Sequence, residues 1–463
     1  MASMGAVSGG SWTKRIRNAG AIALFLCATG AIALTGCHSK PADTAVQPVT
    51  ITYLGWGPAT LSELTTDQAV LSQFTQETGI QVKFIVGPES VTERLQLYLD
   101  ALERKSSTPD VLYTDVVWPG VLAEYVIDLK PYANEEMEIL LPAAVQNNMV
   151  EGRLTAIPFN VEVGLLYYRT DLLTKYGYKH PPETWDELAG MARRIQTGER
   201  AQGRKDFWGF VWQGAAYEGL TCNALEWQFS YGGGKIIEDD GIISVNNPQT
   251  IRALKMAKSW VGSISPPSTL AFKEDDSRNI WDSGNAAFRR DWVWRGNPRG
   301  GTETAIVPGK FSTALLPSGG SGHASALGGQ SLSVSKYSAH PREAAELVRY
   351  LTRREIQMWL WEKGAMLPAL SEFYQDPKYL AARPELQRLR DIVSEGATAR
   401  PSTISGKHYE EVSRAYYSAV HSVLTGEAPA ERAMADLEAA LVKITGFKTG
   451  KPSEGIKSRG GKK

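Results

Sequence analysis

Strand and helix patterns alternate between residues 50 and 115, and this alternation constrains the fold more than any other feature of the chain. Residues 50–54 and 80–86 have the β-branched, apolar composition of strands, with helical spacing between them. A second helical segment, residues 91–104, leads to a short buried strand over residues 110–113. This order predicts an α/β fold whose strands are largely parallel.

Two polar or aromatic side chains follow the last of these strands. Asp115 stands directly after it, and Trp118 follows three residues later. Ligands bind at the carboxyl ends of strands in such sheets, so both residues are candidates for a binding site.

The N-terminus has the order of a secretory signal peptide. Three basic residues precede a run of small and apolar residues over positions 19–33. The ending Leu34-Thr35-Gly36-Cys37 resembles the lipobox of bacterial lipoproteins, which implies that Cys37 is lipidated after residues 1–36 are removed. A plain transmembrane anchor is the competing interpretation, but the run is shorter than the roughly 20 strongly apolar residues that a span needs. The remaining chain is therefore expected outside the cytoplasmic membrane.

Length and charge narrow the class of protein further. About 425 residues follow Cys37, which is more than one hydrophobic core usually covers, so two lobes are expected. Lysine plus arginine and aspartate plus glutamate number 50 each, which removes the electrostatic argument for a nucleic-acid partner. The Lys-, Gly- and Ser-rich tail over residues 448–463 is expected to be disordered.

Cysteine and histidine usage argues against a disulfide or a dedicated metal site. Cys222 is the one cysteine left after Cys27 is cleaved away and Cys37 is lipidated, so no disulfide is expected. The six histidines show no His-x-His or HExxH spacing, and neither a zinc or copper site nor any other cofactor is expected.

The chain changes character beyond residue 150. Residues 154–158 and 163–169 are predicted as two strands. Helical segments follow at residues 185–196, 219–231 and 248–263. Residues 310–316 and 328–335 are predicted as strands that return to the first lobe. From Pro341 to about Thr445 the chain is mostly helical.

Enzyme signatures are weak. Gly232-Gly233-Gly234-Lys235 is followed by Ile236 and so is not a phosphate-binding loop, and no Gly-x-Ser-x-Gly elbow occurs. Glycoside hydrolysis would need two carboxylates at a fixed separation. The candidate carboxylates are Asp115, Glu162, Glu218 and Asp291. Sequence fixes none of their distances, so an exported glycosidase stays open beside a binding protein that is not an enzyme.

Aromatic rings and carboxylates cluster in two places. Residues 207–214 hold aromatic rings and a Gln and are followed by Tyr217 and Glu218, while residues 284–288 lead to Asp291-Trp292-Val293-Trp294. A sugar needs flat apolar surfaces for its C–H faces and charged or amide groups for its hydroxyls. Hydrogen bonds to charged acceptors are worth roughly 1.5–3 kcal/mol each. These clusters favour a carbohydrate ligand.

The chain resembles the extracellular solute-binding proteins of carbohydrate ABC importers (family 1), and most closely their trehalose/maltose-binding lipoproteins. The resemblance is carried by residues 164–173, 182–188, 207–214, 284–288, 327–329, 335–338 and 399–401. It covers residues 50–445, and its motifs fall in the same order. It implies a class II periplasmic-binding-protein-like fold, in which two α/β lobes joined by a multi-crossing hinge close over a sugar and face a membrane permease.

The resemblance also implies a set of ligand-binding residues. These are Asp115, Trp118, Asn160, Glu162, Tyr217, Glu218, Trp292, Trp294, Gly328, Gly329, Gln330 and Arg400, with Glu63 as a weaker candidate. Each could instead have a structural role, such as capping for Asp115, a salt bridge for Glu162, loop support through backbone amides for Glu218 or core packing for the tryptophans. Gln330 and Asn160 stand where some relatives carry aromatic residues, which favours hydrogen bonding over stacking and keeps a longer oligosaccharide open.

The expected domains follow from these patterns. They are a signal peptide (1–36), a tether (37–48), an N-terminal lobe (49–157 with about 306–355), a C-terminal lobe (158–305 with about 356–447) and the tail (448–463). The chain is predicted to be a monomeric, lipid-anchored receptor that binds an α-linked gluco-disaccharide by hinge closure and delivers it to an ABC permease. A structural lipoprotein and a binder of glycerol phosphate or a peptide stay open as competing hypotheses.

Overall fold

The first three strands and two helices form as the sequence predicts. The computed structural model describes residues 48–55, 61–88, 91–293, 309–362, 366–382 and 397–452. In it, β1 (Thr50–Gly55) pairs in parallel with both β2 (Gln81–Val86) and β3 (Val111–Asp115). The connecting helices are α1 (Leu61–Thr78) and α2 (Val91–Glu103). The α/β fold and the parallel start of the sheet are thus confirmed.

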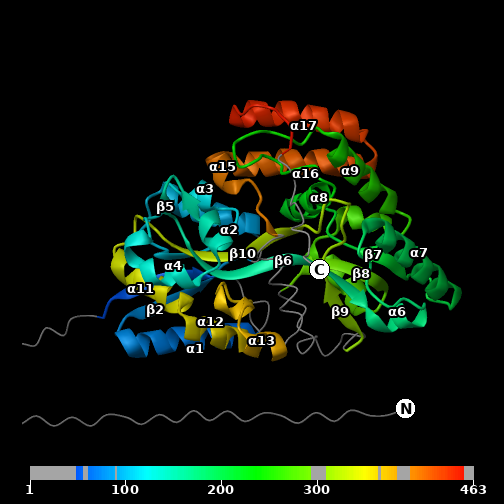
Figure 1. Cartoon of the computed structure of the whole chain (residues 1–463). Coiled ribbons are helices and arrows are strands. Elements are labelled where there is room, and N and C mark those ends of the chain that lie inside the picture. The colour runs from blue at the N-terminus through cyan, green and yellow to red at the C-terminus, as the bar shows by residue number, and fades with distance from the viewer. Residues whose placement is uncertain are drawn as a thin grey trace, which may run out of the picture. The chain divides into compact units, whose positions relative to one another are not determined.

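The described strands join into one mixed sheet around β10. Its order is β2-β1-β3-β10-β6-β8-β7, with β11 beside β10 and β9 beside β6. The later strands are β6 (Ile157–Arg169), β7 (Trp208–Val211), β8 (Ala286–Trp292), β9 (Phe311–Ala314), β10 (Ser325–Val334) and β11 (Ala397–Thr398). A separate hairpin is formed by β4 (Met149–Val150) and β5 (Arg153–Leu154). In Figure 1, β6 and β10 run between the helices near α11 and those near α7.

Two strand predictions need correction. Residues 157–169 form a single strand, β6, instead of two, because Pro158 lies opposite Ser331 next to a register shift in β10, where a missing N–H is tolerated. Strand β9 does not return to the first three strands but pairs antiparallel with the end of β6. The other expected returning strand, β10, does pair with β3, in antiparallel orientation.

Helices cover the sheet on both sides. The bounds of the longer ones are α7 (Trp185–Ala201), α8 (Glu218–Ser230), α9 (Pro248–Trp260), α10 (Glu274–Asp282), α11 (Pro341–Thr352), α12 (Arg354–Glu362), α16 (Tyr409–Thr425) and α17 (Ala430–Thr445). Shorter helices are α3 (Pro119–Leu122), α4 (Asn134–Ile139), α5 (Pro142–Asn147), α6 (Thr170–Lys175), α13 (Pro377–Ala382) and α15 (Ser402–Ser405). The predicted helices are confirmed, including the start at Pro341 and the end at Thr445.

Two large hydrophobic clusters hold these layers together. The first gathers buried side chains from β1, β3, β6, β10 and α11, while the second gathers those of α7, α8, α9, α16 and α17.

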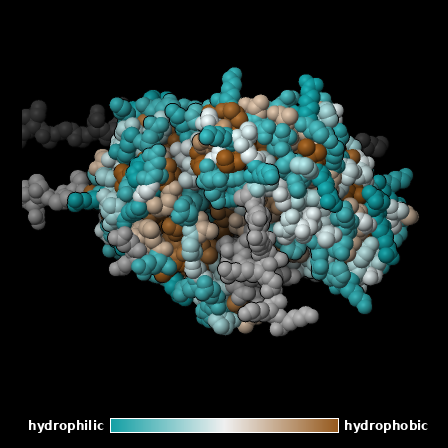
Figure 2. All heavy atoms as spheres, turned by 45° about the horizontal axis from the view of Figure 1, so that its top comes forward, coloured by the Kyte–Doolittle hydropathy of each residue, from teal (hydrophilic) through white to brown (hydrophobic). Residues whose placement is uncertain are grey.

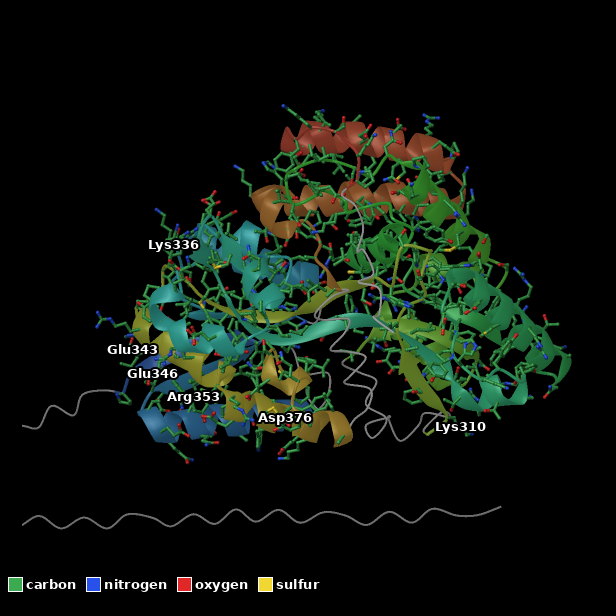
Figure 3. The ribbon with its side chains drawn as sticks, in the orientation of Figure 1. Lys310, Lys336, Glu343, Glu346, Arg353 and Asp376 are labelled. Carbon is green, nitrogen blue, oxygen red and sulfur yellow. The ribbon has the colours of Figure 1, made fainter. Side chains whose placement is uncertain are left out.

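At the surface, Arg353, which Figure 3 labels next to α11, approaches Glu77 of α1 to 3.6 Å. Figure 2 shows the face on the α17 side, where hydrophilic residues predominate. Among the described residues, no helix combines the length and apolar character needed to cross a bilayer.

Two segments pack differently from the expected domain bounds. Residues 366–374, expected in the C-terminal lobe, lie against the N-terminal half, because Leu141 N donates to Ala369 O and Ser371 N donates to Ile139 O. The first residues of the expected disordered tail pair with Ile243, which donates to Lys448 O and accepts from Gly450 N. Residues 1–47 and 453–463 lie outside the described residues.

Candidate ligand-binding site

Strand β10 brings predicted site residues from two other strands together. Gln330 lies opposite Asp115 of β3 on one side and opposite Asn160 of β6 on the other. Two residues earlier, Gly328 lies opposite Glu162 of β6. Because β10 pairs with both neighbours here, five residues from three distant segments of the chain meet at one point of the sheet.

The two amide side chains at this point bind to the protein itself. Asn160 Oδ1 accepts a hydrogen bond from Gln330 N at 2.8 Å, and Gln330 Oε1 accepts one from the Tyr113 hydroxyl at 3.0 Å. Asn160 is 3% exposed and Gln330 is 6% exposed. Their amides therefore fix the junction of β3, β10 and β6, a role that Tyr113 shares and that the sequence patterns did not indicate.

Arg400 connects the end of β3 to the start of α8. Its Nη1 lies 2.6 Å from Glu218 Oε1, its Nη2 donates to Leu327 O at 3.1 Å, and the same Nη2 lies 3.9 Å from Asp115 Oδ1. The Arg400 side chain is only 4% exposed, whereas those of Asp115 and Glu218 retain 15% and 27%. The two carboxylates can thus reach a ligand while the guanidinium between them is held by the protein.

Glu218 is supported by side chains of α16 and not by the backbone amides that a loop-supporting role would require. The Tyr409 hydroxyl donates to Glu218 Oε1 at 2.5 Å, and Ser413 Oγ donates to Glu218 Oε2 at 2.6 Å. Burial, and then the charge of Glu218, hold the pKa of Tyr409 well above its usual range, so the phenol stays a donor. Neither supporting residue was predicted, since both lie more than 190 positions away from Glu218 in the chain.

Trp292, at the end of β8, lies between a buried cation and a glycine. The Arg290 guanidinium carbon stands 4.2 Å from the centre of its ring. A Cβ built on Gly328 would lie 2.8 Å from ring atom Cζ3 and 3.2 Å from Glu162 Cβ. The residue as a whole is partly exposed. Trp292, Gly328 and Glu162, three of the predicted site residues, therefore lie next to one another.

The cation below Trp292 is held by a fully buried carboxylate. Glu226 receives Arg290 Nη2 at 2.5 Å and Arg290 Nε at 3.0 Å, and its Oε1 also accepts from Ala326 N at 3.0 Å. Glu226 was not predicted as part of the site. Because Ala326 lies in β10, Glu226 connects Arg290, the cation that contacts Trp292, to the central strand.

Several predicted residues do not join this surface or fall outside the described residues. Trp118 is 2% exposed and packs edge-on against Tyr98 at 5.8 Å and near Arg94, so the structure places it in the hydrophobic core instead of at the site. Trp118 directly precedes α3, three residues after Asp115, and its ring is buried there. Trp294 and Cys37 lie outside the described residues, and Glu63 falls in α1 without a described side chain.

The last candidate carboxylate is paired with arginines in the interior. Asp291, a candidate for hydrolysis, is fully buried and accepts from Arg278 Nε and Nη2 at 2.9 and 2.8 Å, with Arg289 at 3.3 Å. Burial raises the pKa of Asp291, but the arginine charges outweigh it and keep the pKa below its usual range. Cys222 is a buried free thiol, and within the described part of the chain no group of His, Cys, Asp and Glu could hold a metal ion.

Comparison with known families decides the class. The model of the bacterial extracellular solute-binding protein family matches residues 58–358. The chain belongs to this family. The α/β architecture and the buried acid–arginine network described above are therefore those of an extracellular solute-binding protein.

Individual relatives agree with this assignment. A Deinococcus radiodurans protein named "Probable ABC transporter-binding protein" is 43% identical over 375 residues, 81% of this solute-binding protein and 89% of the relative. The solved structure of maltose-bound T. maritima MalE3 is 33% identical, has a TM-score of 0.77 and covers 86% of this chain and 100% of its own. The maltodextrin-binding protein MdxE of Bacillus subtilis is 24% identical over 312 residues, 65% of this chain and 70% of its own.

Proposed function

We propose that this solute-binding protein binds an α-linked gluco-disaccharide, of the trehalose or maltose type, at the surface around β10. The observation that carries the proposal is that three partly exposed residues lie around β10. Trp292 lies beside Gly328, and Asp115 and Glu218 flank Arg400, which donates to Leu327 O. An indole offers a flat apolar face to a sugar ring, and carboxylates accept from its hydroxyls. The similarity to a maltose-bound relative supports this ligand class.

Binding by hinge closure and delivery to an ABC permease complete the proposal. The proposed lobes are those predicted above, and a ligand that contacts residues from both would favour the closed arrangement over the open one. The signal and lipobox pattern at residues 34–37 supports an exported protein that Cys37 anchors to the membrane. No hydrolysis is proposed, because the matching family model and the Deinococcus radiodurans relative are those of binding proteins.

Calorimetry with a panel of sugars tests the ligand class. We expect saturable binding of maltose or trehalose, and we expect Asp115→Ala to weaken it by at least about 1.5 kcal/mol, roughly tenfold, because one charged acceptor is lost. Silence toward every disaccharide and oligosaccharide at millimolar concentration would remove the sugar assignment. Unchanged affinity of Asp115→Ala would remove that residue from the site.

The acid side of the pH profile gives a second test. Burial raises the pKa of Asp115, and the negative charge of Glu218 raises it further. The positive charges of Arg400 and, more weakly, Arg94 lower it in part. Because a protonated carboxyl is the weaker acceptor, we expect sugar affinity to fall as the pH is lowered through this raised pKa, above the usual aspartate range near pH ~3.9. Calorimetry across this range measures the effect. Asp115→Asn should show weaker binding with a flatter profile, and an unchanged profile would contradict the assignment.

A further inference from the structure

The carboxylate of Glu274 receives two aromatic donors from separate elements. The Tyr217 hydroxyl donates to Glu274 Oε2 at 2.7 Å, and Trp292 Nε1 donates to Glu274 Oε1 at 3.4 Å. Tyr217 ends the turn before α8, and Trp292 is the last residue of β8. Glu274 begins α10 and was not among the predicted site residues. Each oxygen of one carboxylate thus holds one ring of the proposed binding surface.

The Glu274 carboxylate is the polar group that the Tyr217 and Trp292 side chains share. Arg290 lies against the Trp292 ring, and the neighbouring Gly328 leaves room for the ring edge. Lys273 lies 5.7 Å from the centre of the Tyr217 ring. Burial, and then Glu274 itself, hold the pKa of Tyr217 well above its usual range, so its hydroxyl remains a donor at any physiological pH. The contact is therefore a charge-assisted one from a neutral phenol and a neutral indole.

We infer that Glu274 is a positioning residue for sugar recognition. It sets the relative orientation of Tyr217 and Trp292, and this role does not require Glu274 to contact the sugar. The inference rests on the proposed function. Stacking on a sugar ring depends on the tilt of the aromatic ring, and an indole held only by packing could rotate about its side-chain torsions. Hydrogen bonds to both rings from one carboxylate make their positions depend on each other. Glu274 would then set affinity and the choice among disaccharides together.

The test is a double-mutant cycle on the full mature protein, with maltose and trehalose as probes. Glu274→Gln replaces one acceptor oxygen by a donor, and Tyr217→Phe keeps the ring but removes the hydroxyl. We expect each to weaken binding about tenfold, because an aromatic ring in the wrong orientation stacks less well on the sugar. In the double variant we expect little further loss, because both substitutions break the same contact. Losses that simply add would overturn the inference.

A second readout separates positioning from general stability. The fluorescence of Trp292, taken as the difference between the protein and its Trp292→Phe variant, should shift in Glu274→Gln even without sugar. Asp275→Asn is the matched control, since it removes a charge from the next residue of α10, whose carboxylate pairs with Arg278. We expect this control to keep its affinity within about twofold.

The outcomes distinguish the two proposals. If the unsubstituted protein binds no saccharide, the proposed function fails. If it binds sugar while Glu274→Gln keeps the same affinity and the same Trp292 emission, only the positioning role fails. Should Glu274→Gln not fold, Tyr217→Phe decides. A tenfold loss of sugar affinity together with a shift of the Trp292 emission supports the inference, and unchanged affinity or unchanged emission contradicts it.

Discussion

Replacing Glu226 with Gln is expected to lower the free energy of unfolding by about 3–5 kcal/mol. Two atoms of the Arg290 guanidinium lie 2.5 and 3.0 Å from the Glu226 carboxylate, and the Arg290 and Glu226 side chains are 1% and 0% exposed. An amide cannot neutralise the guanidinium, which would stay charged and buried. Urea or thermal unfolding followed by circular dichroism measures the loss.

A surface pair provides the matched control for this substitution. Lys255 and Glu431 form an ion pair in which each side chain is 56% exposed. We expect Glu431→Gln to unfold at nearly the same denaturant concentration as the unsubstituted protein, because water screens that pair. Equal behaviour of the two Gln variants would show that the buried pair does not stabilise the fold.

The double variant Glu226→Leu with Arg290→Met separates stability from binding. Removing both charges together avoids an unpaired buried ion, so we expect much of the lost stability to return. The cation against the Trp292 ring would still be missing. We therefore expect sugar affinity to stay reduced in a protein that is stable again.

Gly329→Ala is expected to be the second most damaging substitution, lowering the free energy of unfolding by about 3 kcal/mol or more. Gly329 has a φ of +111°, which side chains rarely adopt. A Cβ there would lie 2.4 Å from the Asn160 carbonyl oxygen and 2.9 Å from Val161 Cα. These are backbone atoms of β6, so relieving the overlap must separate the two central strands. Thermal unfolding measures the effect, and the displaced strands should abolish sugar binding as well.

Comparison with Gly320→Ala shows how much of the stability lost in Gly329→Ala comes from the overlap with β6. Gly320 has nearly the same φ, +110°, but a Cβ there would meet no atom within 4 Å. This variant should show only the backbone strain, about 1–3 kcal/mol. If both alanine variants lose the same stability, the close approach of β10 to β6 is not what requires a glycine at position 329.

The sequence predicted local elements well because their signals are local. The strands and helices between residues 50 and 115 follow from side-chain periodicity within each segment, and Asp115 is a candidate because a strand end is visible in the sequence. Pairing is not local. Nothing near Asn160 indicates that Gln330 lies opposite it, and this pairing brings the residues of the proposed site together.

The same limit explains the residues that were missed and the one that was misplaced. Glu274, Tyr409 and Glu226 act through partners that lie far from them in the chain, so no motif surrounds them. Trp118 was misplaced for the opposite reason. Its neighbour Asp115 lies at the proposed site, but Trp118 directly precedes the short helix that starts at Pro119, and its indole is buried in the core.

The central position of β10 has a consequence for biogenesis. Both of its neighbours, β3 and β6, are synthesised more than 150 residues before it. Until β10 emerges from the ribosome, each of them has an edge with unpaired backbone groups, which other chains could join in intermolecular sheets. A nascent chain of this topology therefore gains its full set of central backbone pairs only late in translation.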